Sequence, residues 1–332
     1  MMNDSNKPII PAFYINVTEK CNMKCEYCPT YGENWESTDG LLEIRSVLEA
    51  IRIAHKNGIE SFRISGGEPM IFPDRVFAIL SELNKLGISD IILNTNGFNS
   101  YKYTMELAQY KVRKIKISLD TLNRQKFKEI TNLDKLNDVI KSILSIKKAG
   151  LPLELNMVVF KKNSEDFWEI LDFCIEHDIS IKLLDLVYYD ILVRNNETPI
   201  NYWNREYFRF ENYLPELERR FGKPKLVRLS NDRGIPMFEY NIGDTAILCL
   251  KDGTLGSTYA DVCRTCEHFP CQEGLFHMSL SAEGNITPCR LRRDLTLNIK
   301  NQTNTTIEKE FDSTIKAYQN PFFIKNTVDF PI

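Results

Sequence analysis

Short runs of β-branched and apolar residues alternate with longer segments of helical period from residue 12 to about residue 186. Six runs are expected to be strands: Ala12–Val17, Ser61–Ser65, Ile91–Asn94, Lys114–Leu119, Leu153–Phe160 and Ile181–Leu186. Five segments between them are expected to be helices: Leu42–Asn57, Asp74–Leu86, Tyr103–Tyr110, Leu136–Ala149 and Glu165–His177. Strands separated by helices run parallel, so this rhythm predicts an α/β fold whose sheet curls into a partial (βα)6 TIM-like barrel.

The alternation of strand and helix patterns ends after Leu186. A polar, aromatic-rich stretch follows, then an amphipathic helical pattern around Tyr207–Phe221 and a strand candidate at Thr245–Leu250. We therefore expect three regions: a barrel over residues 1–187, a connecting segment with a helix over 188–245, and a small C-terminal domain with its tail over 246–332. The tail from residue 300 is expected to be loosely ordered or to cover the domain.

The charge pattern argues against several kinds of partner. The net charge is -3, with acidic and basic residues interspersed, so nothing in it favours nucleic acid or an anionic membrane surface. No segment approaches the length of a membrane span, and the N-terminus lacks the pattern of a secretory signal. The sequence therefore predicts a cytoplasmic protein.

Of the nine cysteines, all but one are clustered. Three lie within residues 21–28 and five within 249–289, whereas Cys174 stands apart in an amphipathic segment and is expected to be a small core residue. In a long chain without a secretory signal, clustered cysteines more often bind metal or do chemistry than form disulfides.

The first cluster, Cys21-Asn-Met-Lys-Cys25-Glu-Tyr-Cys28, follows the first predicted strand directly and therefore lies on a loop. Three thiolates can ligate three irons of a 4Fe–4S cube, and the fourth iron then keeps an open position, as catalytic metal sites do. In a parallel barrel this loop lies at the C-terminal ends of the strands, where active sites form. A zinc knuckle or a structural cluster is the alternative for the triplet alone.

This spacing, with Tyr27 before the last cysteine, resembles the signature of the radical S-adenosylmethionine (SAM) superfamily. The resemblance implies that Cys21, Cys25 and Cys28 are the catalytic cluster ligands and that the open iron chelates SAM. An electron from the cluster would then cleave SAM to a 5′-deoxyadenosyl radical, which abstracts a hydrogen from the substrate.

Further motifs at the ends of predicted strands match those with which the superfamily binds SAM. The cofactor-binding residues that the resemblance implies are Tyr27, Gly66, Gly67, Glu68, Pro69, Asn94, Ser118 and Asn156. The two glycines are expected to let the backbone approach a ligand closely.

The second cluster contains four thiols that can close another metal site, namely Cys263, Cys266, Cys271 and Cys289. The spacing from Cys271 through Gly284 to Cys289 is similar to the first half of the auxiliary-cluster domains called SPASM and twitch. The turn Ala282–Asn285 is expected to form a β-hairpin with a cysteine on each flank. The resemblance implies a second Fe–S cluster, 4Fe–4S in type, while a structural zinc site is the alternative. Cys249 is either a substitute ligand or a buried thiol in its strand.

Beyond these signatures, the chain from Ala12 to Cys289 resembles the GTP 3′,8-cyclases of molybdenum-cofactor biosynthesis, in the runs Ile117–Asn123, Phe127–Thr131 and Leu155–Val159. The resemblance implies a homologous architecture. Cyclases leave one iron of the C-terminal cluster free for guanine and grip the triphosphate with arginines.

This chain departs from the cyclases where they hold substrate. Cys271 is a fourth thiol that could occupy the free iron, and Tyr14 stands where cyclases have an arginine. Arg63 keeps its matching position. Three arginines after Cys289 either meet an anionic group or form a solvated face: Arg290, Arg292 and Arg293.

The leading hypothesis is a radical SAM enzyme, of oxidoreductase or lyase type, that oxidises, crosslinks, epimerises or cyclises a small metabolite or a peptide in specialised biosynthesis. A fully ligated second cluster would serve as an electron conduit, since an iron without a free position cannot bind substrate. A GTP 3′,8-cyclase is one alternative, and a non-catalytic Fe–S or zinc protein is another. A reducing partner such as flavodoxin or ferredoxin is implied. Tyr14 and Tyr188, at strand ends, are candidate pocket residues or hydrogen donors.

Overall fold

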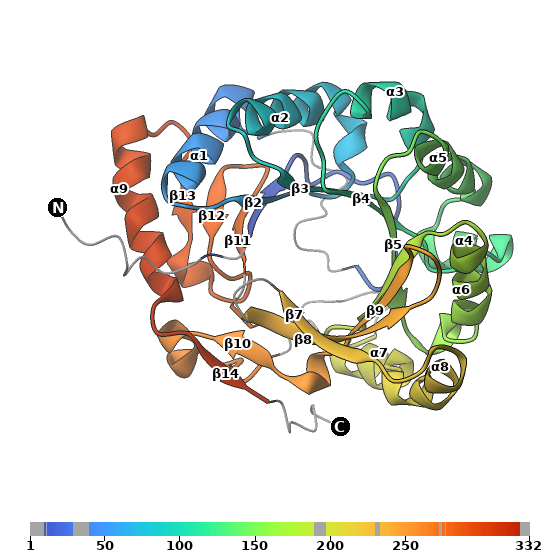
Figure 1. Cartoon of the computed structure of the whole chain (residues 1–332). Coiled ribbons are helices and arrows are strands. Elements are labelled where there is room, and N and C mark those ends of the chain that lie inside the picture. The colour runs from blue at the N-terminus through green and yellow to red at the C-terminus, as the bar shows by residue number, and fades with distance from the viewer. Residues whose placement is uncertain are drawn as a thin grey trace.

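The computed structural model describes residues 10, 12–28, 40–188, 197–229, 233–271, 274–275 and 277–325. Six parallel strands follow one another in the sheet in chain order: β1 (Phe13–Asn16), β2 (Ser61–Ser65), β3 (Asp90–Thr95), β4 (Lys114–Ser118), β5 (Leu153–Val159) and β6 (Ser180–Asp185). The strands curl into a ring with the connecting helices on its outside (Figure 1). The predicted partial barrel is confirmed.

The connecting helices are α1 (Ile44–Lys56), α2 (Pro73–Lys85), α3 (Thr104–Leu107), α4 (Arg124–Thr131), α5 (Leu136–Lys148) and α6 (Asp166–Glu176). The pattern does not predict α4, because its eight residues contain only Phe127 and Ile130 as large apolar side chains. Its start is fixed locally, since the Asn123 side chain accepts a hydrogen bond from the Lys126 backbone N–H at 3.0 Å.

The C-terminal part of the chain extends the same sheet at both edges. Beside β6 lies the parallel strand β9 (Ile247–Lys251), followed by the antiparallel strands β8 (Arg233–Asn241) and β7 (Lys225–Leu229). Beside β1 lies the parallel strand β11 (Met278–Leu280), followed by the antiparallel strands β12 (Asn285–Thr287) and β13 (Leu297–Asn298). The barrel is thereby flanked on both sides by strands from the last third of the chain.

A second, two-stranded sheet pairs β10 (Ser257–Tyr259) with β14 (Phe322–Ile324). The expected hairpin is present, because β11 and β12 pair across the turn at Ala282–Asn285. The boundaries of the three predicted regions stay a prediction.

The barrel strands bury one face against the helices and present a polar face to the interior of the ring. On β1, Phe13 and Ile15 are fully buried, whereas Tyr14 between them is half-buried. On β4 the same alternation places Lys114 and Lys116 on the face opposite to the buried Ile115 and Ile117. The hydrophobic core therefore lies between strands and helices, and the interior of the ring is left for polar side chains.

The segment expected to be one helix over Tyr207–Phe221 is divided. The helix α8 (Leu214–Phe221) forms its second half, after a 3-10 turn at Phe210–Asn212, and α7 (Pro199–Glu206) precedes both. Pro215 lies in the first turn of α8, the only place where a helix accommodates proline without losing a hydrogen bond.

The tail contains the helix α9 (Asn304–Ile315), which lies alongside α1 and β13 (Figure 1). Its Phe311 is fully buried, and the Phe311 ring contacts the Phe13 ring of β1 at a centroid distance of 6.1 Å. The tail therefore covers the outer face of the sheet at β1, the strand that leads into the first cysteine cluster.

Replacing Phe311 with alanine should lower the free energy of unfolding by about 3 to 5 kcal/mol, because it empties a fully buried aromatic site. Urea denaturation followed by circular dichroism measures the effect. The exposed neighbour Lys309→Ala serves as the control, with a change below about 0.5 kcal/mol. Equal effects of the two substitutions would show that α9 is not part of the core.

Candidate functional site

The first cysteine loop begins where β1 ends and continues the pairing of β1 with β2. The Gly67 N–H donates to the Thr18 carbonyl at 2.8 Å, and the Glu68 N–H donates to the Lys20 carbonyl at 2.7 Å. The Gly-Gly-Glu segment after β2 therefore lies directly against the residues that precede Cys21.

The two glycines are required by this approach. A Cβ on Gly66 would lie 2.3 Å from the Thr18 carbonyl oxygen, and a Cβ on Gly67 would lie 2.2 Å from the Lys20 carbonyl oxygen. Gly66 also has a φ of 137°, which residues with side chains rarely adopt. The glycines thus let the β2 loop support the cysteine loop; their predicted approach to a ligand stays a prediction.

The other end of the cysteine loop is attached to the opposite part of the barrel. The Lys24 N–H donates to the Thr131 carbonyl at 2.8 Å, and the Glu26 N–H donates to the Ile130 carbonyl at 3.0 Å, both at the C-terminus of α4. The Glu26 carboxylate also forms an ion pair of 2.8 Å with Lys162. The loop therefore runs from β1 to the β4–β5 side of the barrel.

Tyr27 fixes the end of the loop that carries Cys28. Its hydroxyl donates to the Asp120 carboxylate at 2.7 Å, and its ring packs on Phe160 at a centroid distance of 5.8 Å. Burial, together with the negative charge of Asp120, raises the pKa of Tyr27 well above its usual value, so the hydroxyl keeps its proton as a donor.

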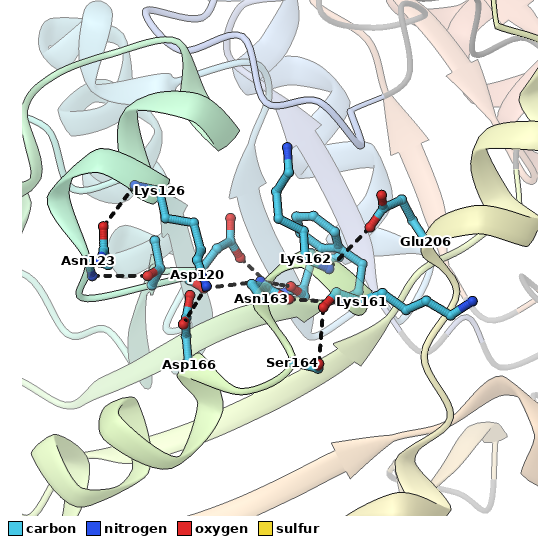
Figure 2. A network of polar contacts seen from close by, with 12 residues as sticks. Asp120, Asn123, Lys126, Lys161, Lys162, Asn163, Ser164, Asp166 and Glu206 are labelled. Atoms are coloured by element: carbon cyan, nitrogen blue, oxygen red, sulfur yellow. Dashed lines mark hydrogen bonds and ion pairs between the residues drawn. The ribbon is translucent and has the colours of Figure 1, made fainter.

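Asp120 is itself held by the end of β5 and by the turn that follows it. Its other carboxylate oxygen accepts a hydrogen bond from the Val158 N–H at 2.9 Å, and its carbonyl accepts one from the Asn163 side chain at 3.0 Å. Figure 2 shows Asn163 at the centre of this network, with Lys161 and Lys162 beside it and Glu206 of α7 bound to the Lys162 backbone. Burial raises the pKa of Asp120 to about 6.

Glu68 fixes the segment next to the Cys21 end of the loop, as Asp120 does at the Cys28 end. The buried Glu68 carboxylate accepts hydrogen bonds from the Met70 N–H at 2.9 Å, the Thr95 hydroxyl at 2.6 Å and the Asn96 N–H at 2.6 Å. Burial raises its pKa to about 7 against the lowering effect of these donors. The carboxylate is thus engaged with the loop after β3, and any contact of Glu68 with SAM would use its backbone.

The remaining predicted SAM contacts lie on the polar face of the barrel strands. Ser118 at the end of β4 is exposed and pairs in register with Asn156 on β5. The Asn156 side-chain oxygen is buried without a hydrogen bond in the part of the chain described, and Asn94 on β3 is half-buried. A buried acceptor beside an exposed hydroxyl fits a polar ligand such as SAM. Pro69 is buried at the start of a 3-10 turn.

The sequence-based prediction does not include the charged side chains that precede Ser118 and Asn156 on the same face of β4 and β5. The Glu154 carboxylate on β5 lies 2.5 Å from the ammonium groups of both Lys114 and Lys116 on β4. Burial alone would raise the pKa of Glu154, but the two lysines outweigh burial and lower it to about 2. The sequence does contain a signal for these residues, because charged residues at every second position of a strand in a parallel barrel point into the ring.

Lys182 on β6 adds a further basic side chain. Its side chain forms no hydrogen bond or ion pair within the described ranges, and it pairs in register with Asn156 on one side and Cys249 on the other. Burial lowers its pKa to about 7, helped by repulsion from Lys116. Arg63, by contrast, is ion-paired with Asp90 at 3.2 Å.

Four cysteines of the second cluster line one cavity, and their expected role as metal ligands stays a prediction. One small cavity is lined by Cys263, Cys266, Cys271 and Cys289, together with apolar side chains and Arg292. Burial raises the pKa of Cys263, which a bound metal would have to overcome. Cys249 does not line this cavity: it lies on β9 beside Lys182, and burial raises its pKa to about 11.

Three other residues singled out in the sequence are Cys174, Tyr14 and Tyr188. Cys174 is fully buried in the core, as predicted. The Tyr14 ring contacts the His277 ring at a centroid distance of 4.6 Å with the planes tilted by 50°, and Tyr188 contacts Trp203 edge-on at 6.4 Å. Over the described residues, no three His, Cys, Asp or Glu side chains are grouped to hold a single metal ion, and no helix is long and apolar enough to cross a membrane.

Comparison with known proteins identifies relatives along most of the chain. The sequence model of the radical SAM superfamily matches residues 15–174. A protein of Pyrococcus horikoshii named as a probable GTP 3′,8-cyclase is 30% identical over 289 residues, which cover 86% of this chain and 85% of the relative. The GTP 3′,8-cyclase of Aliarcobacter butzleri is 27% identical over 92% of this chain and 88% of its own length.

Solved structures share the fold. The crystal structure of Streptococcus suis SuiB superposes with a TM-score of 0.60 and 17% identity over 94% of this chain, which spans 66% of the SuiB chain. A structure of anSMEcpe with bound AdoMet and a peptide gives a TM-score of 0.56 and 16% identity over 92% of this chain and 82% of its own. The likeness to both extends beyond the barrel into the C-terminal strands.

Gly67→Ala should reduce both stability and iron binding, because its new Cβ would overlap the Lys20 carbonyl beneath the cysteine loop. We expect a loss of about 2 to 4 kcal/mol in unfolding free energy and a lower iron content after anaerobic reconstitution. The control is Gly87→Ala, where φ is also unfavourable at 76° but no atom lies within 4 Å. Gly87→Ala should cost about 1 kcal/mol and leave iron binding unchanged; equal iron contents in the two variants would contradict the role assigned to Gly67.

Proposed function

The chain belongs to the radical SAM superfamily, and we propose that within this superfamily of enzymes it carries out the reaction of a GTP 3′,8-cyclase. The observation that carries the proposal is the extent of the likeness to enzymes of that name, which spans 86% of this chain and 85% of a relative. A likeness over 289 residues extends beyond the barrel into the C-terminal third of the chain. This reading is preferred over the broader expectation of an unspecified metabolite or peptide substrate.

The residues for the proposed cofactors lie in two places. Cys21, Cys25 and Cys28 would hold the 4Fe–4S cluster that binds SAM, and the cavity with four thiols would hold the second cluster. When bound, SAM and its cluster supply the radical that removes a hydrogen atom from substrate. The chain itself would contribute two polar contacts, the Ser118 hydroxyl and the Asn156 side-chain oxygen, which has no hydrogen bond among the described residues.

The polar face of the barrel favours a substrate with negative charge. Lys114 and Lys116 share a single carboxylate, Glu154, and Lys182 has no partner of its own among the described residues. A phosphate group near these lysines would be stabilised by their ammonium groups and would favour the protonated form of Lys182. The lysines offset in part the loss of an arginine at Tyr14, although Arg63 is already ion-paired with Asp90.

Cyclisation of this kind leaves the atomic composition of the nucleotide unchanged. One hydrogen atom is removed by the radical, a carbon–carbon bond forms within the nucleotide, and one electron and one proton are then returned. The second cluster would supply that electron, and a flavodoxin or ferredoxin would supply electrons to the enzyme. A cytoplasmic location stays a prediction.

A second candidate is supported by Cys271. Because Cys271 lines the same cavity as Cys263, Cys266 and Cys289, the second cluster would have four protein ligands and no iron free for guanine. A closed cluster suits electron transfer away from substrate, as in the oxidation, crosslinking or epimerisation of a metabolite or a peptide. The two candidates therefore differ in whether GTP binds.

Anaerobic reconstitution with iron and sulfide should give about eight irons per chain, falling to about four when Cys21, Cys25 and Cys28 are all changed to alanine. With SAM, dithionite and GTP, the wild type should form 5′-deoxyadenosine together with a product isomeric with GTP, measured by mass spectrometry. Formation of 5′-deoxyadenosine without GTP binding or conversion would favour the second candidate instead.

Lys182→Met should weaken the binding of GTP about 10- to 100-fold, since one charge-assisted hydrogen bond contributes about 1.5 to 3 kcal/mol. Equilibrium dialysis of the reconstituted protein without reductant measures the affinity. The control is Lys148→Met on the exposed side of α5, which should bind GTP as the wild type does. An unchanged affinity in Lys182→Met would exclude this lysine as a contact of the substrate.

A further inference from the structure

We propose that the side-chain amide of Asn96 is a positioning residue that sets the reduction potential of the SAM-binding cluster through an N–H···S hydrogen bond to Cys21. The Asn96 Nδ2 atom lies 3.7 Å from the Cys21 Sγ atom, within hydrogen-bonding range for sulfur. The proposal concerns the cluster and not the substrate, so it is independent of the proposed reaction with GTP.

Two contacts fix the orientation of this amide. Its Oδ1 atom accepts a hydrogen bond from the Phe98 N–H at 3.0 Å, so the Nδ2 atom must face the other way. The Nδ2 atom also donates to the Asn22 side-chain oxygen at 2.6 Å, which uses one of its two hydrogens. The second hydrogen is then available to the Cys21 sulfur.

A hydrogen bond also fixes the backbone of Asn96. The Asn96 N–H donates at 2.6 Å to Glu68, whose buried carboxylate is also fixed by Thr95 and Met70. Glu68 therefore acts on the cluster through Asn96 and not by contact with it. This gives the acidic residue of the Gly-Gly-Glu segment a physical role that differs from direct cofactor binding.

The hydrogen bond should change the reduction potential of the cluster because reduction changes the charge of the cluster. A 4Fe–4S cluster with three thiolate ligands becomes more negative by one unit when it accepts an electron, and an N–H directed at a ligand sulfur stabilises the more negative state. The amide should therefore raise the potential. Cys21 already accepts the Met23 backbone N–H at 3.4 Å, so Asn96 adds a side-chain donor that substitution can remove.

The variant Asn96→Ser tests this directly. A serine hydroxyl can still accept the Phe98 N–H, as Ser and Thr do in such turns, but it is too short to reach Cys21. The matched control is Asn22→Ala, which removes the partner of the amide and leaves the Asn96 donor to Cys21 in place. Iron and sulfide are counted for each reconstituted protein, and its midpoint potential is measured by a titration followed by electron paramagnetic resonance, without substrate.

We expect Asn96→Ser to bind iron as the wild type does and to have a lower midpoint potential, whereas Asn22→Ala should not shift downward. Asn96→Asp keeps the acceptor and the shape but has no N–H at all, and should also lower the potential. Equal potentials in Asn96→Ser and wild type would overturn the proposal. Loss of the cluster in both Asn96 variants would also overturn it, because the amide would then hold the loop and not tune the cluster.

Discussion

The loop that carries the first three cysteines is attached at both ends, and the rest of the site depends on this attachment. At one end its backbone lies against Gly66 and Gly67, closer than any side chain would permit. At the other end it is bound to the C-terminus of α4 and to the segment after β5. The three thiols are therefore carried by a loop that joins two distant parts of the barrel wall.

Two buried carboxylates maintain this arrangement in the same way. Glu68 orders the loop after β3, which contacts Cys21 through Asn96, and Asp120 binds the hydroxyl of Tyr27 next to Cys28. Each carboxylate follows one strand and accepts a hydrogen bond from the next, since Glu68 after β2 binds Thr95 of β3 and Asp120 after β4 binds Val158 of β5. Glu68 lies in a motif expected to bind SAM, and its side chain instead supports a neighbouring segment.

The side chains inside the barrel indicate the charge of the substrate, whereas the C-terminal cavity indicates the role of the second cluster. The excess of lysine over carboxylate on β4, β5 and β6 favours an anion, in keeping with the likeness to GTP 3′,8-cyclases. The four thiols around one cavity favour a cluster without a free iron, in keeping with electron transfer. Under the proposed function, the barrel lysines and not the second cluster would hold the nucleotide, which reconciles the two observations.

The sequence by itself determined the strand order of the barrel, the position of the first cysteine loop and the grouping of the second set of cysteines. These features follow from local periodicity and spacing, which are properties of adjacent residues. Only the tertiary structure decided that the last third of the chain would extend both edges of the barrel sheet, and that Asn96, Asp120 and Lys182 would surround the site. Their roles arise from contacts between strands far apart in the chain, where a single polar residue leaves no pattern in its own neighbourhood.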